Sequence, residues 1–77
     1  MKHSVGVIGL GNMGRGIAGN IAKDGHKLLA WDAIEQARAP FANIATLVQP
    51  AEMAALADFI IFVVPGSQEI ELSLIHI

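Results

Sequence analysis

The chain has 77 residues, of which 53 % are hydrophobic, and its formal net charge is −2. This composition is typical of one soluble globular domain and argues against intrinsic disorder. The five lysines and arginines are scattered, which argues against a nucleic-acid or anionic-membrane surface, and the absence of cysteine excludes disulfides and thiolate metal sites.

The first half of the chain predicts a strand, a helix and a second strand. A β-branched run over residues 4–8 ends at a glycine, which is typical of a buried parallel strand. Residues 12–24 carry apolar side chains at helical spacing, and the glycine that follows ends the helix. The apolar run at 27–31 predicts a second strand that stops at Asp32.

The second half of the chain continues the alternation. Residues 35–39 predict a short helix that Pro40 stops, and residues 41–48 predict a weaker third strand. Pro50 suits the first turn of a third helix. The run FIIFVV at 59–64 is the strongest strand signal in the chain.

Alternating strands and helices predict an α/β fold, a Rossmann-type doubly wound parallel sheet that is truncated after about four strands in the order 3-2-1-4. The first and fourth strands are then neighbours, reached over opposite faces of the sheet. Ligands bind outside the carboxyl ends of the strands at such a switch point. We therefore expect binding residues directly after the first, second and fourth strands.

A glycine-rich turn follows the first strand, and it fits the pattern G-x-G-x-x-G with Gly9, Leu10, Gly11, Asn12, Met13 and Gly14. In this pattern Gly9 makes a tight turn, Gly11 lets the backbone approach a pyrophosphate, and Gly14 lets helix and strand pack closely. The helix that starts here directs free N–H groups at an anion. Gly16 and Gly19 lie in the helix outside the pattern, and we expect them to permit close packing on the sheet.

The context of the glycine turn favours a dinucleotide over a plain turn in an unrelated α/β domain, because the turn lies between a strand and a helix and Asp32 follows the second strand. We expect the Asp32 carboxylate to accept hydrogen bonds from ribose hydroxyls and to repel a 2′-phosphate, which favours NAD over NADP. Val64 and Pro65 end the fourth strand, and we expect them to line the cofactor site near the nicotinamide; a plain strand-end turn is the alternative.

The stretch from Gly9 to Asp32, GLGNMGRGIAGNIAKDGHKLLAWD, resembles the opening of the 3-hydroxyacid (β-hydroxyacid) dehydrogenases, the family that contains 3-hydroxyisobutyrate dehydrogenase. The later QPAEMAALADFIIFVVPGSQEIE resembles that family's next segment. The resemblance implies hydride transfer between NAD and a small 3-hydroxy acid or its semialdehyde, in a full-length protein that forms a homo-oligomer. It also implies cofactor contacts from Gly9, Leu10, Gly11, Asn12 and Met13 to the pyrophosphate, from Asp32 to the ribose, and from Val64 and Pro65.

The family's substrate-binding segment and its catalytic lysine lie beyond this chain, so no catalytic residue is assigned and the 77 residues alone are expected to be inactive. NADP-using relatives commonly show Asn-Arg-Thr where this chain has Asp32-Ala33-Ile34. We expect Arg15 and Arg38 to be solvated surface charges, although either could compensate for the missing arginine. A noncatalytic dinucleotide-binding or redox-sensing module and an imine or other small-substrate reductase remain alternatives.

The segment LSLIHI at 72–77 interrupts the helix that the family has at this point, and its composition suits a strand. It looks like the translation of a sequencing adapter. We therefore expect residues 1–71 to be the N-terminal part of the NAD(P)-binding domain and 72–77 to be a non-native tail; a natural fifth strand is the alternative. A sheet that stopped at the fourth strand would leave that strand's outer edge unpaired.

The remaining polar residues indicate no further site. His3, His26 and His76 match no zinc spacing, so we expect no metal, and Asp58 is expected to cap a turn before the last predicted strand. The N-terminal apolar run is broken by glycines and has no cleavage pattern, unlike a signal peptide. The run at 53–64 is shorter than the ~20 residues of a membrane span. These observations predict a cytoplasmic protein without a membrane segment.

Overall fold

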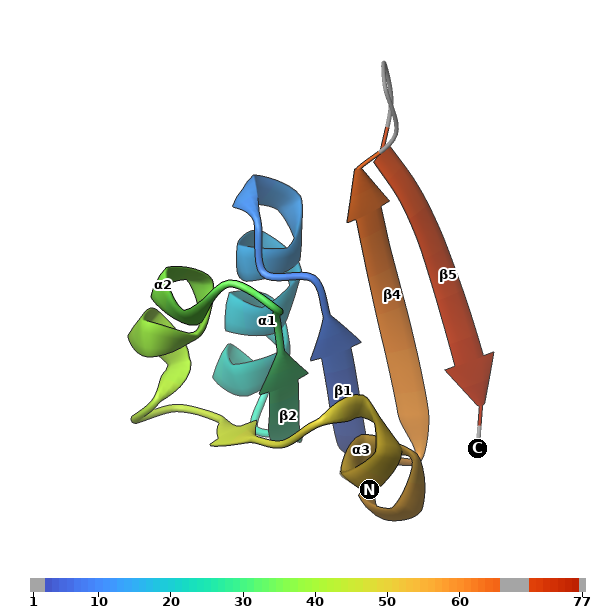
Figure 1. Ribbon diagram of the computed structural model, residues 1–77. Coiled ribbons are helices and arrows are strands. Elements are labelled where there is room, and N and C mark those ends of the chain that lie inside the picture. Colours follow the sequence, from blue (N-terminus) through green and yellow to red (C-terminus); the bar gives the residue numbers. More distant parts are fainter. Residues whose placement is uncertain (1–2, 66–69, 77) are drawn as a thin grey trace.

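The fold is known from a computed structural model, which describes residues 3–65 and 70–76, and from residue 64 onward the backbone alone (Figure 1). In chain order the elements are β1 (Ser4–Ile8), α1 (Asn12–Lys23), β2 (Lys27–Trp31), α2 (Glu35–Arg38), the 3-10 turn η1 (Ala39–Phe41), β3 (Thr46–Leu47), α3 (Pro50–Leu56), β4 (Phe59–Pro65) and β5 (Ile70–His76). In this part of the chain no helix is long and apolar enough to cross a membrane.

The strands form one sheet in the order β3-β2-β1-β4-β5. β1 pairs with β2 and β4 in parallel, and β2 pairs with β3 in parallel. The predicted order 3-2-1-4 is therefore confirmed. β1 lies at the centre, so its carboxyl end is flanked by the carboxyl ends of β2 and β4.

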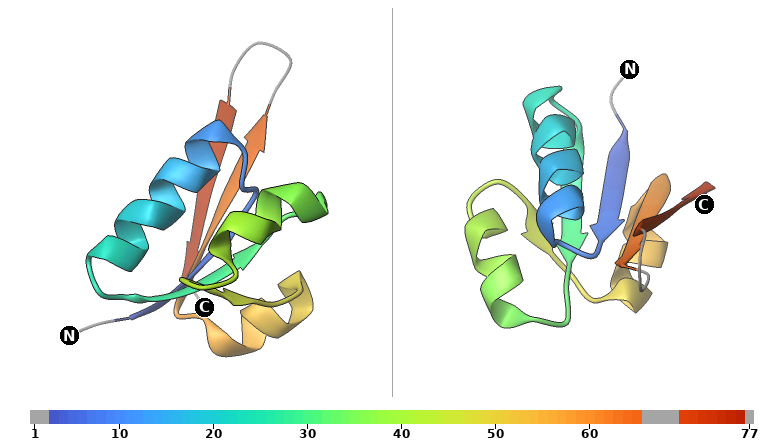
Figure 2. Two further views of the ribbon diagram at one scale, coloured as in Figure 1. Left: turned by 90° about the vertical axis from the view of Figure 1, so that its left-hand side faces the viewer. Right: turned by 90° about the horizontal axis from the view of Figure 1, so that it is seen from above.

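The helices cover both faces of the sheet, and each face has its own apolar core (Figure 2). Neighbouring residues of β2 alternate between the two cores, since successive side chains of a strand point to opposite faces. Leu28 packs with Ala18 of α1, whereas Leu29 packs with Met53 of α3. Met53 lies so close to Gly6 of β1 that a Cβ at residue 6 would overlap its side chain.

The third strand is much shorter than the predicted run of residues 41–48, because only Thr46 and Leu47 pair with β2. Pro40 and Phe41 lie in the 3-10 turn η1 instead. The Phe41 side chain is buried in the core on the α1 face, and residues 43–45 then turn the chain toward the sheet. Burial of one aromatic ring has therefore overridden the strand pattern of this segment.

The expectation for Gly16 and Gly19 is wrong. A Cβ added at either position would meet no atom within 4 Å, so neither glycine permits a close contact. The helical repeat explains this, because residues four apart share a face. Gly14 and Ala18 are buried on the face of α1 that packs on the sheet.

The expectation of an unpaired outer edge on the fourth strand is also wrong. β5 pairs with β4 in antiparallel register, from Phe59 opposite His76 to Pro65 opposite Ile70 (Figure 1). Residues 70–76 therefore form a strand beside β4, whereas the resemblance to the 3-hydroxyacid dehydrogenases implies a helix at this point. β5, and not β4, is therefore the edge strand on this side of the sheet.

Candidate functional site

The turn after β1 requires glycine at its first position. Gly9 has φ of +100°, a conformation that side chains disfavour, and a Cβ there would overlap the Val63 carbonyl oxygen of β4. The Gly9 N–H donates to the Trp31 carbonyl oxygen at 2.9 Å, which ties the turn to the end of β2. The turn is thus held between the ends of β2 and β4, where the sequence predicts it.

Gly14 is the second position that requires glycine. A Cβ there would overlap the carbonyl oxygen of Gly9, so α1 could not approach the turn as closely as it does. Gly14 is buried on the sheet side of α1. The close packing that the glycine pattern predicts is therefore confirmed at this residue.

Gly11 differs from the other two glycines of the pattern, because a Cβ added there would meet nothing within 4 Å. Gly11 is the N-cap of α1, no side chain caps this end, and the first turn holds no acidic residue. Asn12 and Met13 of that turn are exposed. The free N–H groups and the positive dipole end of α1 are thus accessible to an anion such as a pyrophosphate.

The Asp32 carboxylate lies directly beside this turn. Oδ2 accepts the Leu10 N–H at 2.7 Å, and Oδ1 accepts the Ile34 N–H at 2.8 Å. A carboxylate has about four acceptor positions, so roughly two remain for a ligand. The structure therefore brings together the glycine pattern and the acid that the sequence predicts for ribose binding, and the bond to Leu10 fixes their relative position.

Arg38 also lies in this region. The expectation that it is a solvated surface charge is wrong. Its guanidinium carbon lies 4.4 Å from the centre of the Trp31 ring, and its Nη1 donates to the Asp32 carbonyl oxygen at 3.1 Å. The residue is half-buried. α2 is short, and the spacing from Asp32 to Arg38 carries no signal that could have revealed this contact. Arg15 does lie exposed, with Nη2 donating to Asn12 Oδ1 at 3.3 Å.

Val64 and Pro65 end β4 at the same edge of the sheet. β1 ends at Ile8, which lies opposite Phe62, so β4 extends beyond β1 toward the turn. Only the backbone of Val64 and Pro65 is described, and it pairs with Glu71 and Ile70 of β5. Their contact with the nicotinamide half of a cofactor stays a prediction.

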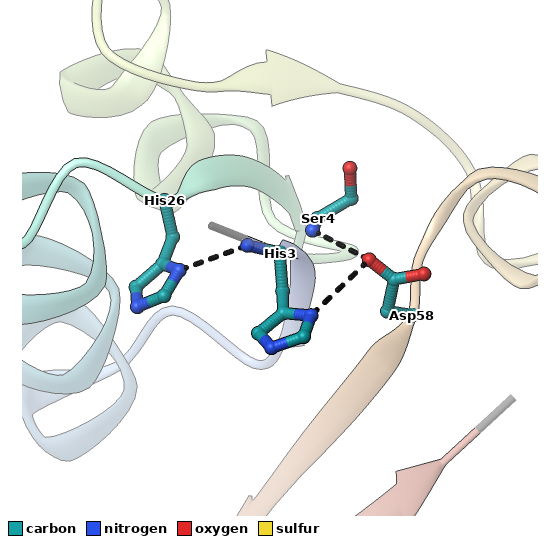
Figure 3. Close-up of polar contacts among 4 residues, drawn as sticks. All are labelled: His3, Ser4, His26 and Asp58. Atoms are coloured by element: carbon teal, nitrogen blue, oxygen red, sulfur yellow. Dashed lines mark hydrogen bonds and ion pairs between the residues drawn. The ribbon is translucent and has the colours of Figure 1, made fainter. Parts of the chain in front are cut away.

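The amino ends of the strands carry a different cluster (Figure 3). Asp58 Oδ2 accepts the Ser4 N–H at 2.9 Å and lies 3.8 Å from His3 Nδ1, while the His3 N–H donates to His26 Nδ1 at 3.1 Å. Asp58 therefore joins β4 to β1 across 54 residues instead of capping a local turn, as the sequence had suggested. Among the described residues no group of three acidic or histidine side chains is arranged to hold a metal ion.

A shallow open depression of about 290 Å³ lies at this same amino edge. Its lining includes His26, Lys27, Asn43 and Thr46, from the start of β2 and the loop before β3. These residues are at the opposite end of β2 from Asp32, so the depression is separate from the glycine turn.

Comparisons with known proteins agree with this geometry. Residues 4–75 match the family described as the NAD binding domain of 6-phosphogluconate dehydrogenase. The chain is 41 % identical over 68 residues to mitochondrial 3-hydroxyisobutyrate dehydrogenase of Homo sapiens and of Mus musculus, a match that covers 86 % of this chain and 20 % of each relative. The Drosophila melanogaster protein of the same name is 35 % identical over 72 residues, covering 91 % and 22 %.

The chain thus spans about a fifth of the length of the curated relatives that it matches. No solved structure matches it significantly. The predicted resemblance to the 3-hydroxyacid dehydrogenases is confirmed, and these relatives are oxidoreductases by name. Since the family match extends over almost all of the described residues, the chain belongs to the family of NAD binding domains found in 6-phosphogluconate dehydrogenase.

Proposed function

We propose that this chain is the NAD-binding part of an oxidoreductase that transfers hydride between NAD and a small 3-hydroxy acid or its semialdehyde. The observation that carries the proposal is the hydrogen bond from the Leu10 N–H to Asp32 Oδ2. This bond supports the proposal because it joins the carboxylate that we assign to the ribose and the turn that we assign to the pyrophosphate, which are neighbours in a bound dinucleotide. The relatives named 3-hydroxyisobutyrate dehydrogenase support the substrate class.

The residues of the turn hold and orient the cofactor in this proposal. Gly11 leaves room for the pyrophosphate at the uncapped end of α1, and the free acceptor positions of Asp32 receive the ribose hydroxyls. Bound NAD supplies the hydride chemistry itself. The match covers 20 % of each 3-hydroxyisobutyrate dehydrogenase relative, and the proposal assigns proton transfer and substrate binding to the remainder of a protein of that length.

We further propose NAD as the preferred cofactor, because the Asp32 carboxylate opposes a 2′-phosphate, and a homo-oligomer for the full-length protein. We also propose a cytoplasmic location, on the sequence grounds given above; the curated relatives carry the word mitochondrial in their names. Fractionation of cells that express the tagged full-length protein tests the location, and recovery in the mitochondrial fraction contradicts it.

Residues 1–71 form the cofactor-binding part in this proposal, and residues 72–77 are a tail foreign to it. The family match to residue 75 and the pairing of residues 70–76 with β4 favour the alternative of a natural fifth strand. Sequencing of the source DNA across the codons for Glu71 and Leu72 tests this division. We expect the natural frame to continue into a helical domain with a positioned lysine. A natural stop codon directly after Ile77 would favour the noncatalytic module instead.

Cofactor binding is tested by titrating the 77-residue chain with NAD in a calorimeter. Trp31 is the only tryptophan of the chain and adjoins Asp32, so its fluorescence gives a second readout. The Gly11→Ala variant places a methyl group in open space at the turn, and we expect it to fold while its affinity for NAD falls about tenfold or more.

The matched control is Gly16→Ala, because its added methyl group also meets nothing within 4 Å but lies outside the glycine pattern. We expect this variant to bind NAD as the unaltered chain does. Absence of NAD binding by the unaltered chain would contradict the proposed function. Equal affinity of Gly11→Ala and the unaltered chain would contradict the proposed position of the pyrophosphate.

A further inference from the structure

The two methionines among the described residues differ in exposure. Met13, in the first turn of α1, is 47 % exposed, whereas Met53 of α3 is fully buried. A thioether reacts with a dissolved oxidant only when the oxidant reaches its sulfur, so burial protects Met53. In the part of the chain that the structure describes, Met13 is therefore the methionine open to oxidation.

Met13 belongs to the turn of α1 that has free backbone donors. The first bond of the helical ladder runs from the Arg15 N–H to the Gly11 carbonyl oxygen at 2.8 Å. The N–H groups of the three residues between them precede this ladder and have no partner within α1. No side chain caps this end of α1, and its first turn holds no acidic residue. The accessible thioether and the free donors are thus in the same turn.

Oxidation of a methionine changes the polarity of its side chain without adding a net charge. A thioether is apolar and accepts hydrogen bonds weakly, whereas a sulfoxide is polar and its oxygen is an acceptor with partial negative charge. With hydrogen peroxide, the sulfur lone pair attacks one peroxide oxygen, an S–O bond forms and the O–O bond breaks. The sulfur loses two electrons to the peroxide, and the departing hydroxide takes the proton of the transferred oxygen and leaves as water.

We propose that Met13 is an oxidation site through which hydrogen peroxide lowers the affinity of this chain for NAD, an inference that rests on the proposed NAD-binding function. The sulfoxide oxygen competes with the pyrophosphate for the free N–H groups of the turn and opposes its negative charge. The fold tolerates this change, because Met13 belongs to neither apolar core. A sulfoxide at Met53 would instead place a polar group inside the core on the α3 face.

The test measures the dissociation constant of NAD by calorimetry before and after treatment of the 77-residue chain with hydrogen peroxide, which is removed before the titration. Peptide mass spectrometry locates the added oxygen, and we expect it at Met13 before Met53. The affinity for NAD should fall about three- to tenfold, as for one lost hydrogen bond, and a methionine sulfoxide reductase should restore it. Saturating NAD should slow the oxidation of Met13, because the bound cofactor covers the turn.

Met13→Leu and Met53→Leu are the matched variants, since each replaces one thioether by a hydrocarbon of similar volume. Peroxide should leave the affinity of Met13→Leu at its value before treatment, and it should lower that of Met53→Leu as it does in the unaltered chain. An equal loss in Met13→Leu would overturn the inference, as would complete oxidation of Met13 with unchanged affinity. So would a loss of affinity that accompanies unfolding of the oxidised chain. If the untreated chain binds no NAD, the proposed function itself fails and the inference fails with it.

Discussion

An aspartate accepts a backbone N–H at both ends of the parallel strands, at the carboxyl ends (the carboxyl edge) and at the amino ends (the amino edge). At the carboxyl edge, Asp32 accepts the Leu10 N–H just after β1, and at the amino edge Asp58 accepts the Ser4 N–H at the start of β1. Each carboxylate thereby ties the central strand to a neighbouring strand. Asp32, directly after β2, holds the carboxyl end of β1, and Asp58, directly before β4, holds its amino end.

The surroundings of the two acids differ. Beside Asp32 lie a glycine turn with open space at Gly11 and the uncapped end of α1. Beside Asp58, His3 stacks on His26 with ring centres 6.0 Å apart (Figure 3). The His3 ring also lies 5.3 Å from the Phe59 ring in an edge-to-face arrangement. A carboxylate bonded to a backbone N–H is therefore not by itself evidence of a binding site. At Asp32 the second feature is the uncapped, open end of α1.

The largest expected effect is a loss of stability from a substitution at the contact between α1 and the glycine turn. Gly14→Ala forces the helix away from the Gly9 carbonyl oxygen, and we expect the free energy of unfolding to fall by about 2 kcal/mol or more. Gly16→Ala, on the open side of the same helix, should raise it by about 0.5 to 1 kcal/mol. Urea unfolding monitored by circular dichroism measures both values, and similar stabilities for the two variants would contradict the packing assigned to Gly14.

The next largest effect is on NAD affinity, which should distinguish Asp32 from Asp58. Asp32→Asn removes an acceptor of the ribose hydroxyls, and we expect affinity for NAD to fall about tenfold, as for a lost hydrogen bond to a charged group. Asp58→Asn should leave that affinity unchanged, because the residue lies at the other edge of the sheet. Calorimetric titration compares them. A similar loss in both variants would mean that the amino edge also affects the cofactor site.

The same two variants should also differ from the unaltered chain in stability. Each removes one charge from a carboxylate that accepts a backbone N–H, so the free energy of unfolding should fall by about 1 kcal/mol in both. Thermal unfolding of the two purified variants, each without ligand, gives the values. If Asp58→Asn is as stable as the unaltered chain, the hydrogen bond from the Ser4 N–H to Asp58 does not stabilise the position of β1.

The smallest expected effect concerns the rings of the amino edge. His3→Ala removes the stacking on His26 and the contact of 3.8 Å with Asp58. Both partners of that contact are about half exposed, so we expect a loss of at most about 1 kcal/mol of stability and no change in NAD affinity. A loss of NAD binding in this variant would contradict the separation of the two edges.

Local sequence patterns were sufficient to predict α1, β1, β2 and β4 and the main parts of the candidate site. The helical spacing of α1, the β-branched and apolar runs of β1, β2 and β4, the glycines and Asp32 are local patterns, and local patterns persist wherever the chain packs. The sheet order followed from the rules of parallel crossovers.

Contacts between residues far apart in the sequence were not predictable from these local patterns. The bonds from Asp32 to Leu10 and from Asp58 to Ser4 join residues 22 and 54 positions apart. Arg38 reached Trp31 because η1 and the buried Phe41 set where the short helix α2 lies, and β5 paired with β4 because an open strand edge offers unpaired N–H and C=O groups. These contacts depend on packing across the whole sheet, which no local pattern encodes.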